Sequence, residues 1–188
     1  MFQTLLPGML PAVVIAAAWP AFAEPGDAGT PPETVSRVEL DLYTGLWHEI
    51  ARIPNRFQRQ CARDTTAHYA LRADGRIDVV NRCVTADGSV KEARGIARVV
   101  DPASNAKLEV SFVRILGWRL FWGDYWIIGL DPDYRFAVIG HPDRSYGWIL
   151  SRQPRLDDTT RRRIDAVLKD RGYDPAQFEA SPQSRPRP

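Results

Sequence analysis

Residues 64–100 read DTTAHYALRADGRIDVVNRCVTADGSVKEARGIARVV, and this stretch decides the fold class. It contains three runs rich in valine, isoleucine, tyrosine and threonine, the residue types that pleated strands favour. The short sequences Ala73-Asp74-Gly75 and Asp87-Gly88-Ser89 separate the runs. Aspartate and glycine accept the backbone conformations of tight turns, so the stretch predicts three antiparallel strands joined by hairpins.

The same alternation of β-rich runs and turns continues on both sides of this stretch. Turn sequences at 101–105, 131–133 and 141–143 divide the following residues into further runs. We therefore predict eight consecutive strands, at about 45–53, 64–72, 76–85, 90–100, 106–114, 123–130, 134–140 and 145–152. The connection 115–122, Ile-Leu-Gly-Trp-Arg-Leu-Phe-Trp, is unusually apolar for a loop.

Eight antiparallel strands with short links and no helix between them protect their edges best by closing into a barrel. The predicted fold class is therefore all-β, an eight-stranded up-and-down antiparallel β-barrel. A two-sheet sandwich is the second hypothesis, because sandwiches usually need longer crossover connections. A barrel of this size either holds one small ligand or is filled by its own side chains, and the sequence leaves both open.

One C-terminal helix is expected to pack against the outside of the barrel. Asp157 and Asp158 can cap its start, and Gly172 can end it. Ile164 and Leu168 are spaced to lie on one face of such a helix. A single short helix buries only one stripe of apolar side chains, which fits an outer position.

The two ends of the chain differ in composition from its middle. Residues 1–23 carry no charge and end in Ala21-Phe22-Ala23, so we expect a signal peptide, with a membrane anchor as the less favoured interpretation. Proline-rich and glycine-rich residues 24–37 predict a disordered leader, and 179–188 a disordered tail. The folded domain then spans 38–178, and its expected location is the periplasm or the outside of the cell.

The composition and charge of the chain argue against one functional class, the nucleic-acid-binding proteins. The chain has 188 residues, 44% of them hydrophobic, which is enough for one domain with a packed core. Its formal charge is only +2, and basic and acidic residues are interleaved along most of the sequence. Because nucleic-acid-binding proteins usually concentrate basic residues on one face, we expect no nucleic acid among the partners.

Three motifs occur in order along the predicted strands: GLWHEIAR at 45–52, LDPDY at 130–134 and YGWILSR at 146–152. They resemble the three lipocalin signatures. The strings AHYALRADG at 67–75 and VVNRC at 79–83 are similar to the bacterial outer-membrane lipocalin and apolipoprotein D-like branch. The resemblance implies a calyx that binds and carries small apolar ligands, such as long-chain fatty acids or lysophospholipids.

Bacterial members of this branch are often lipoproteins, and this chain departs from them at one point. No cysteine follows Ala23, the end of the predicted signal peptide, so no lipid is expected to be attached there. The resemblance combined with this departure favours a soluble protein of the cell envelope. Peripheral contact with a membrane and a homodimer are left open.

Alternation of side chains along the strands assigns a candidate set to the barrel interior. Trp47 defines the inward face of the first strand, which then also carries Gly45, Glu49 and Ala51. Ala67, Leu71 and Ile77 share the inward face of later strands. The candidate ligand-binding residues are Glu49, Tyr69, Val79, Asn81, Val110, Phe112, Tyr125, Ile127, Tyr146 and Trp148. For the apolar members, ordinary core packing is the alternative to ligand contact.

Two inward residues have competing interpretations. Glu49 either contacts a ligand head group or is held by an internal arginine such as Arg94 or Arg152, because a buried carboxylate needs a partner. Arg152 shares a face with Trp148 and reaches the same end as Trp47 when the first and last strands pair. We assign Trp47 and Arg152 a structural role, as a cation-π pair that closes one end of the barrel.

Cys61 and Cys83 are the only cysteines, and an exported chain with an even count favours a disulfide. A reactive dithiol is the alternative, although the spacing shows no Cys-x-x-Cys pattern. The disulfide would join the loop after the first strand to the third strand.

The chain is not expected to be an enzyme. Its three histidines, His48, His68 and His141, lack the spacing of metal ligands, and nucleophile-elbow, P-loop and dinucleotide motifs are absent from the sequence. We expect no metal and no cofactor. Two other functional classes stay open: a lipocalin-like enzyme using Glu49 or a tyrosine, and an envelope interaction protein that docks through the apolar 115–122 loop.

Overall fold

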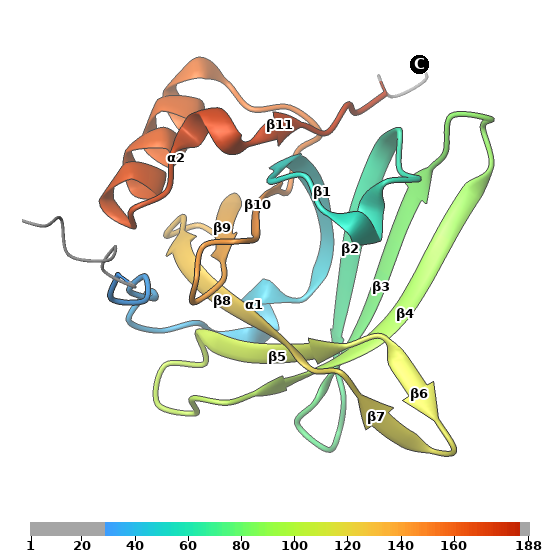
Figure 1. Ribbon diagram of the computed structural model, residues 1–188. Helices are drawn as coiled ribbons and strands as arrows, with labels where there is room; N and C mark the ends of the chain where they lie inside the picture. The colour runs from blue at the N-terminus through green and yellow to red at the C-terminus, as the bar shows by residue number, and fades with distance from the viewer. Residues whose placement is uncertain (1–28, 185–188) are drawn as a thin grey trace, which may run out of the picture.

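The computed structural model describes residues 29–184 and shows a closed barrel with one helix beside it (Figure 1). The strands are antiparallel neighbours in chain order, and the last barrel strand pairs with the first, which confirms the predicted eight-stranded barrel with an outer C-terminal helix. The predicted signal peptide, 1–23, lies outside the described residues. Among those residues, helices long and apolar enough to cross a membrane are absent.

The elements have the following bounds. The barrel strands are β1 (Gly45–Arg52), β2 (Arg63–Leu71), β3 (Ile77–Val84), β4 (Val90–Val99), β5 (Lys107–Ser111), β8 (Gly123–Leu130), β9 (Phe136–Gly140) and β10 (Gly147–Ser151). The smaller strands are β6 (Val113–Ile115), β7 (Trp118–Leu120) and β11 (Glu179–Ala180). The helices are α1 (Leu40–Tyr43) and α2 (Asp158–Asp170), with the 3-10 turns η1 (Arg56–Gln58) and η2 (Pro175–Gln177).

The apolar connection after β5 differs from the expected loop. It forms a second, two-stranded sheet in which β6 pairs with β7, so the predicted strand 106–114 is divided between β5 and β6. Figure 1 shows this hairpin projecting away from the barrel wall.

Antiparallel strands in chain order place their connections alternately at the two ends of the barrel. We call one end the mouth; it carries the connections 53–62, 85–89, 112–122 and 141–146. We call the other the closed end, because the segment 35–43, which includes α1, lies across it. There Val38 N–H donates to Ser104 O (2.7 Å), and Asn105 Nδ2 donates to Val38 O (3.1 Å).

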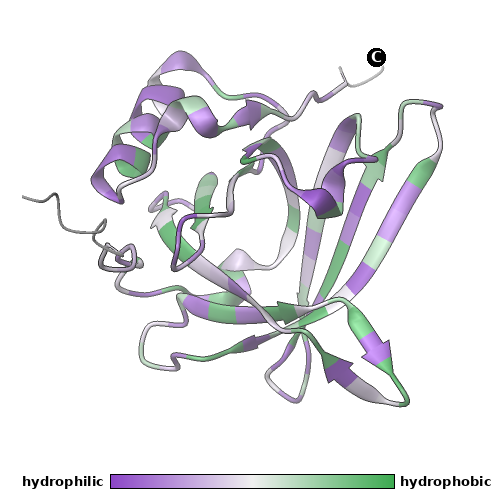
Figure 2. Cartoon of the chain, in the orientation of Figure 1, coloured by the Kyte–Doolittle hydropathy of each residue, from purple (hydrophilic) through white to green (hydrophobic). Residues whose placement is uncertain are grey.

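Two apolar cores lie on opposite sides of the barrel wall. The inner core is inside the barrel, and its members include Trp47, Ile77, Val79, Ala97, Leu108, Ile127, Ile139 and Leu150. The outer core lies between α2 and the wall and includes Ile128, Val138, Ile149, Ile164, Leu168, Tyr173 and Phe178. In Figure 2 the exposed side of α2 is largely hydrophilic, as expected for a helix that buries one stripe.

Glycine in the wall allows α2 to approach closely. A Cβ atom at Gly129 in β8 would lie 2.6 Å from Val167 Cγ1. The helix begins as predicted, because the side chain of Asp157 accepts a hydrogen bond from Thr160 N–H (2.8 Å). Arg163 of α2 reaches the buried Asp131 carboxylate at 3.2 Å, which ties the helix to the β8–β9 turn.

A β-bulge in β1 corrects one part of the predicted inward face. The register between β1 and β10 shifts between Glu49 and Ala51, so one extra residue is present in β1. Beyond this bulge the side chains exchange faces: Ala51 lies opposite Ile149 and belongs to the outer core. The prediction that Ala51 faces inward is therefore wrong, and Arg52 takes the inward position opposite Trp148.

The terminal segments are more ordered than their composition indicates. Glu179 and Ala180 form β11, which pairs with the end of β1. Ser181 N–H donates to Ile50 O (2.8 Å), so the expected disordered tail is instead attached to the barrel over 179–184. In the expected leader, Val35 N–H donates to Ile127 O (2.9 Å). Backbone hydrogen bonds to barrel strands position both segments, and Val35 also packs against the inner core.

Candidate functional site

The closed end of the interior is sealed by Trp47 and Arg152, which the pairing of β1 with β10 brings together. The guanidinium carbon of Arg152 lies 3.8 Å from the centroid of the Trp47 ring, and Trp47 is fully buried. Arg152 also donates hydrogen bonds to Leu42 O (2.7 Å), Thr44 O (2.8 Å) and Leu46 O (2.7 Å). This arrangement joins α1 to the barrel and covers that end of the interior.

Three tyrosine hydroxyl groups meet above this seal. The Tyr125 hydroxyl lies 2.7 Å from the Tyr43 hydroxyl and 3.0 Å from the Tyr69 hydroxyl. Tyr69 and Tyr125 are two of the predicted site residues, whereas Tyr43, from α1, was not predicted. Burial raises the pKa of Tyr69 to about 12 and raises the pKa of Tyr43 and Tyr125 well above the ordinary value. These phenols therefore stay neutral at physiological pH.

The tyrosine cluster has a testable alkaline behaviour. The folded state holds the Tyr69 proton at pH values where the unfolded chain, with a pKa of 10.0, releases it. The stabilisation is complete below pH 10.0 and is lost as the pH rises toward about 12. We expect the tyrosinate absorbance of these three residues to appear only together with unfolding, followed by circular dichroism. Ionisation of every tyrosine near pH 10.0 in a folded protein would contradict the buried cluster.

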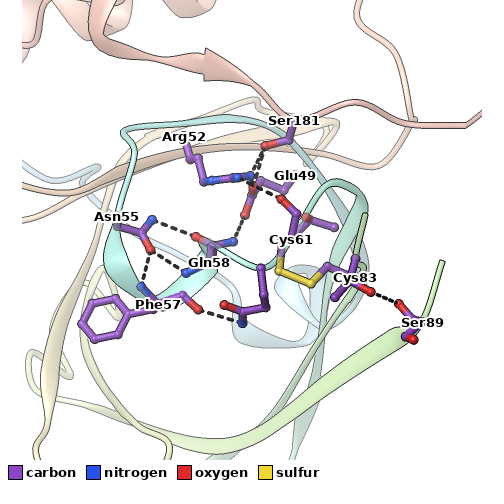
Figure 3. The surroundings of a disulfide bond; sticks show 12 residues. Glu49, Arg52, Asn55, Phe57, Gln58, Cys61, Cys83, Ser89 and Ser181 are labelled. Atoms are coloured by element: carbon purple, nitrogen blue, oxygen red, sulfur yellow. Dashed lines mark hydrogen bonds and ion pairs between the residues drawn. A yellow bond between two sulfur atoms is a disulfide. The ribbon is translucent and has the colours of Figure 1, made fainter. Parts of the chain in front are cut away.

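Glu49 is the centre of a polar network near the mouth (Figure 3). One carboxylate oxygen accepts from Arg52 Nη1 (2.7 Å) and Ser181 Oγ (2.5 Å), and the other accepts from Gln58 Nε2 (2.6 Å). Glu49 is 4% exposed. Both carboxylate oxygens are thus occupied by groups of the chain itself. The partner arginine is Arg52, not Arg94 or Arg152, because the bulge turns Arg52 inward.

The network extends to the aromatic residues of the mouth. Gln58 Oε1 accepts hydrogen bonds from Trp148 Nε1 and Asn55 Nδ2, both at 2.9 Å. Tyr146 stacks on Trp148, with 6.0 Å between ring centroids and 8° between ring planes. Phe57 lies beside Tyr146, with 5.8 Å between centroids. The predicted residues Tyr146 and Trp148 therefore line the mouth on the side of the β1–β2 connection.

The predicted disulfide between Cys61 and Cys83 is present, with 5.5 Å between their Cα atoms (Figure 3). It joins the β1–β2 connection to β3. Asn55 Oδ1 further shapes this connection by accepting from the backbone N–H groups of Phe57 and Gln58, both at 3.1 Å. The disulfide and the Glu49 network together hold the loop that borders the mouth.

The upper interior is more open than the lower interior. Val79 and Ile127 are 2% and 0% exposed, so these two predicted residues belong to the packed lower core. Higher on the same inward faces, Val110 is half-buried and Phe112 is 39% exposed. A Cβ atom at Gly95 would come within 2.8 Å of the Phe112 ring, so the ring lies across the inward face of β4.

Two polar groups in the wall lack hydrogen-bond partners. Thr65 is 5% exposed, and neither its Oγ1 nor Asn81 Oδ1 has a partner among the described residues. Asn81 pairs in register with Ala67 and Ala93, which places it on the inward face. Because a buried polar atom without a partner is energetically costly, these atoms are favourable positions for a ligand to supply one.

Sequence reasoning missed several residues of this site: Tyr43, Arg52, Asn55, Phe57, Gln58, Thr65 and Ser181. The inward turn of Arg52 depends on the bulge, and Ser181 comes from the segment expected to be disordered. Tyr43 lies only four residues before Trp47, and its ring centroid is 5.1 Å from that of Trp47. An aromatic residue at that distance from the first motif was the one available signal.

Other features lie outside the barrel interior. Two surface hollows of about 420 and 300 Å³ are lined by residues such as Trp126 and Arg82, which face outward. In the described part of the chain, clusters of histidine, cysteine and carboxylate side chains suited to a metal ion are absent.

Comparisons with known proteins agree with this architecture. A family model described as a lipocalin-like domain matches residues 38–183. Temperature-induced lipocalin-1 of Arabidopsis thaliana is 39% identical over 155 residues, covering 81% of this chain and 83% of that protein. Outer membrane lipoprotein Blc of Escherichia coli K12 is 38% identical over 153 residues, covering 79% and 83%. The resemblance to bacterial outer-membrane lipocalins is confirmed.

Comparison with a solved structure also supports this fold. Insecticyanin from the tobacco hornworm Manduca sexta superposes with a TM-score of 0.66 at 25% sequence identity, covering 84% of this chain and 86% of that one. The barrel, the sealed end and the sequence matches lead to one conclusion: the chain belongs to the lipocalin family.

Proposed function

We propose that the protein binds one long-chain fatty acid or lysophospholipid in the upper interior of the barrel and carries or stores it in the cell envelope. Family membership supports a binding role for a small apolar ligand, since lipocalins are generally binding and transport proteins. The similarity to a protein named as an outer membrane lipoprotein supports the cell envelope, with the periplasm as the proposed location.

The observation that carries this proposal is the difference between the two halves of the interior. The lower half is packed by apolar side chains, whereas Ala93, Val110 and Phe112 face inward in the upper half and remain exposed or half-buried. An acyl chain against these side chains would remove apolar surface from water. Each buried methylene contributes about 0.8 kcal/mol, so ten contribute about 8 kcal/mol before the costs of binding.

The polar groups of the wall support a head group near the mouth. Lys91 pairs in register with Cys83 and therefore shares the inward face of Asn81, one step closer to the mouth. An ammonium group and an amide at these positions suit a carboxylate or a phosphate ester. We propose that Asn81 and Lys91 bind the head group, while Glu49 acts indirectly by holding Arg52 and Gln58 in place.

The proposal predicts that chain length controls affinity. Calorimetry of delipidated protein with saturated fatty acids of increasing length should show roughly fourfold tighter binding per added methylene until the interior is full. A blocking variant tests the location: Ala93→Trp fills the upper interior and should abolish binding. Ala70→Trp introduces the same side chain on the exposed outer face of β2 and should leave binding unchanged.

Two results would overturn the carrier proposal. The first is an affinity that does not change along the series, and the second is the absence of binding by a folded, delipidated protein. Binding that survives Ala93→Trp and follows chain length would place the ligand elsewhere on the molecule. In that case the interaction-protein hypothesis gains support.

A further inference from the structure

The β6–β7 hairpin has two chemically different faces. Its cross-strand pairs are Val113 with Leu120, Arg114 with Arg119, and Ile115 with Trp118. Opposed residues of an antiparallel pair point to the same side, and successive pairs point to opposite sides. One face is therefore entirely apolar, and the other carries the two arginines.

This apolar face is not covered by the rest of the described chain. On this face Trp118 is 76% exposed, Ile115 is 49% exposed, and Val113 and Leu120 are each 38% exposed. Beside the face, Leu116 at the tip is 95% exposed and Phe121 is 78% exposed. Large apolar side chains gathered at one projecting site are unusual on a soluble surface and mark a site of interaction. In Figure 2 the hairpin shows green apolar segments beside purple hydrophilic ones.

The backbone holds the apolar tip in an unfavourable conformation. Leu116 and Gly117 both have positive φ, 48° and 89°, as the two central residues of a tight hairpin turn do. Asparagine or glycine normally occupies the first of these positions, because leucine is strained there. Phe121 is also left-handed, with φ of 57°. The chain therefore places two large apolar residues at exposed sites where neither exposure nor conformation favours them.

The positive charge of the hairpin indicates a negatively charged partner. Residues 110–123 include Arg114 and Arg119 and no aspartate or glutamate. Arg114 and Arg119 are opposed in register across the hairpin, so two like charges share one face, although Arg119 Nη1 also donates to Ser111 O (3.2 Å). A partner with an apolar phase can bury the apolar face, and negative charge on the same partner can bind the arginines. An anionic lipid bilayer has this combination at its surface. Tryptophan is favoured at that depth.

We propose that the β6–β7 hairpin docks the protein on an anionic lipid surface. The apolar face and Leu116 enter the boundary between head groups and acyl chains, and Arg114 and Arg119 bind lipid phosphates. The hairpin belongs to the β5–β8 connection, which lies at the mouth. Docking therefore turns the mouth toward the lipid, and the value of this orientation for loading or releasing a ligand rests on the proposed carrier function.

The test uses vesicle flotation with protein purified by the secretory route, so that N-terminal processing is the same in every variant. Vesicles contain phosphatidylcholine alone or mixed with phosphatidylglycerol. We expect binding to the mixed vesicles to fall roughly tenfold or more for Leu116→Asp. The matched control is Leu42→Asp, which changes another exposed leucine, 58% exposed, at the closed end, and should bind like the original protein.

Two double variants test whether the preference for anionic vesicles comes from Arg114 and Arg119 or from the net charge of the protein. Arg114→Gln combined with Arg119→Gln should remove the preference for phosphatidylglycerol. Arg155→Gln combined with Arg162→Gln removes the same formal charge far from the hairpin and should preserve that preference. Equal losses in both double variants would show general electrostatic attraction and would overturn the assignment to the hairpin.

The remaining outcomes are also decisive. Absence of binding to both vesicle types overturns the proposal, and so does a dimer in solution that Leu116→Asp dissolves, since the hairpin would then contact a second copy. Calorimetry of the Leu116→Asp variant with a monomeric fatty acid distinguishes the docking proposal from the carrier proposal. Unchanged fatty-acid affinity with lost vesicle binding is the expected result, whereas vesicle binding without fatty-acid affinity would refute only the carrier function.

Discussion

Replacing Trp47 with alanine should cost about 3–5 kcal/mol in the free energy of unfolding, the largest effect we expect from one substitution. The side chain is fully buried, it donates from Nε1 to Tyr43 O (2.8 Å), and it lies under the Arg152 guanidinium. Its loss opens a cavity at the closed end and removes the surface on which α1 and Arg152 pack. Thermal unfolding should shift downward by roughly 6–20 °C.

Trp118→Ala is the matched control, because it makes the same chemical change at an exposed position. We expect its stability to change by no more than about 0.5 kcal/mol. Arg152→Ala should fall between the two, at about 1–3 kcal/mol, since three carbonyl groups lose a charged donor. Ligand affinity measured below all transitions should stay close to that of the original protein. A loss of affinity in a folded Trp47→Ala variant would move Trp47 from the seal into the ligand site.

Removing the disulfide by the double substitution Cys61→Ser and Cys83→Ser should lower stability by about 3 kcal/mol. The two cysteines are separated by 22 positions, and closing a loop of that size restricts the unfolded chain by this amount in the entropy model. The melting temperature should fall by roughly 6–12 °C. The β1–β2 connection should also exchange its amide hydrogens faster, because the disulfide attaches it to β3.

A reducing agent supplies the internal control for this experiment. It should destabilise the original protein to the level of the double variant and should leave the double variant unchanged. Denatured protein that was never reduced should contain no titratable thiol. Two free thiols in that sample, or equal stability of the two proteins, would contradict a structural disulfide.

The sequence predicted the barrel and the closed end because both depend on local patterns. Turn residues at regular intervals separate strands whose side chains alternate, and the strand order follows the chain, so the pairing of the first and last strands needs no further information. The Cys61–Cys83 disulfide was predicted on other grounds, because two cysteines in an exported chain allow only one intramolecular pairing. Trp47 and Arg152 meet because strand pairing alone places them together.

The candidate site was predicted less completely, because its polar members depend on departures from regular structure. Alternation carried past Glu49 fails at the bulge, and Arg52 rather than Ala51 faces inward. Glu49 was recognised as inward, but its partners come from three separate segments: β1, η1 and the residues after β11. Neither composition nor periodicity carries information about such distant contacts.

The sequence by itself determined the all-β class, the strand order, the outer helix and the chemical identity of the interior, because each follows from side-chain alternation and turn chemistry over a few residues. Only the tertiary structure decided which interior positions are packed and which are open, how Ser181 attaches to Glu49, and that residues 113–120 form a hairpin with an apolar face and an arginine face. The physical reason is that bulges, segment docking and unpartnered polar atoms depend on the free energy of the whole packed chain. A short stretch of sequence constrains its own backbone. The hydrogen-bond partners and the burial of its side chains depend on segments that only the folded chain places beside it.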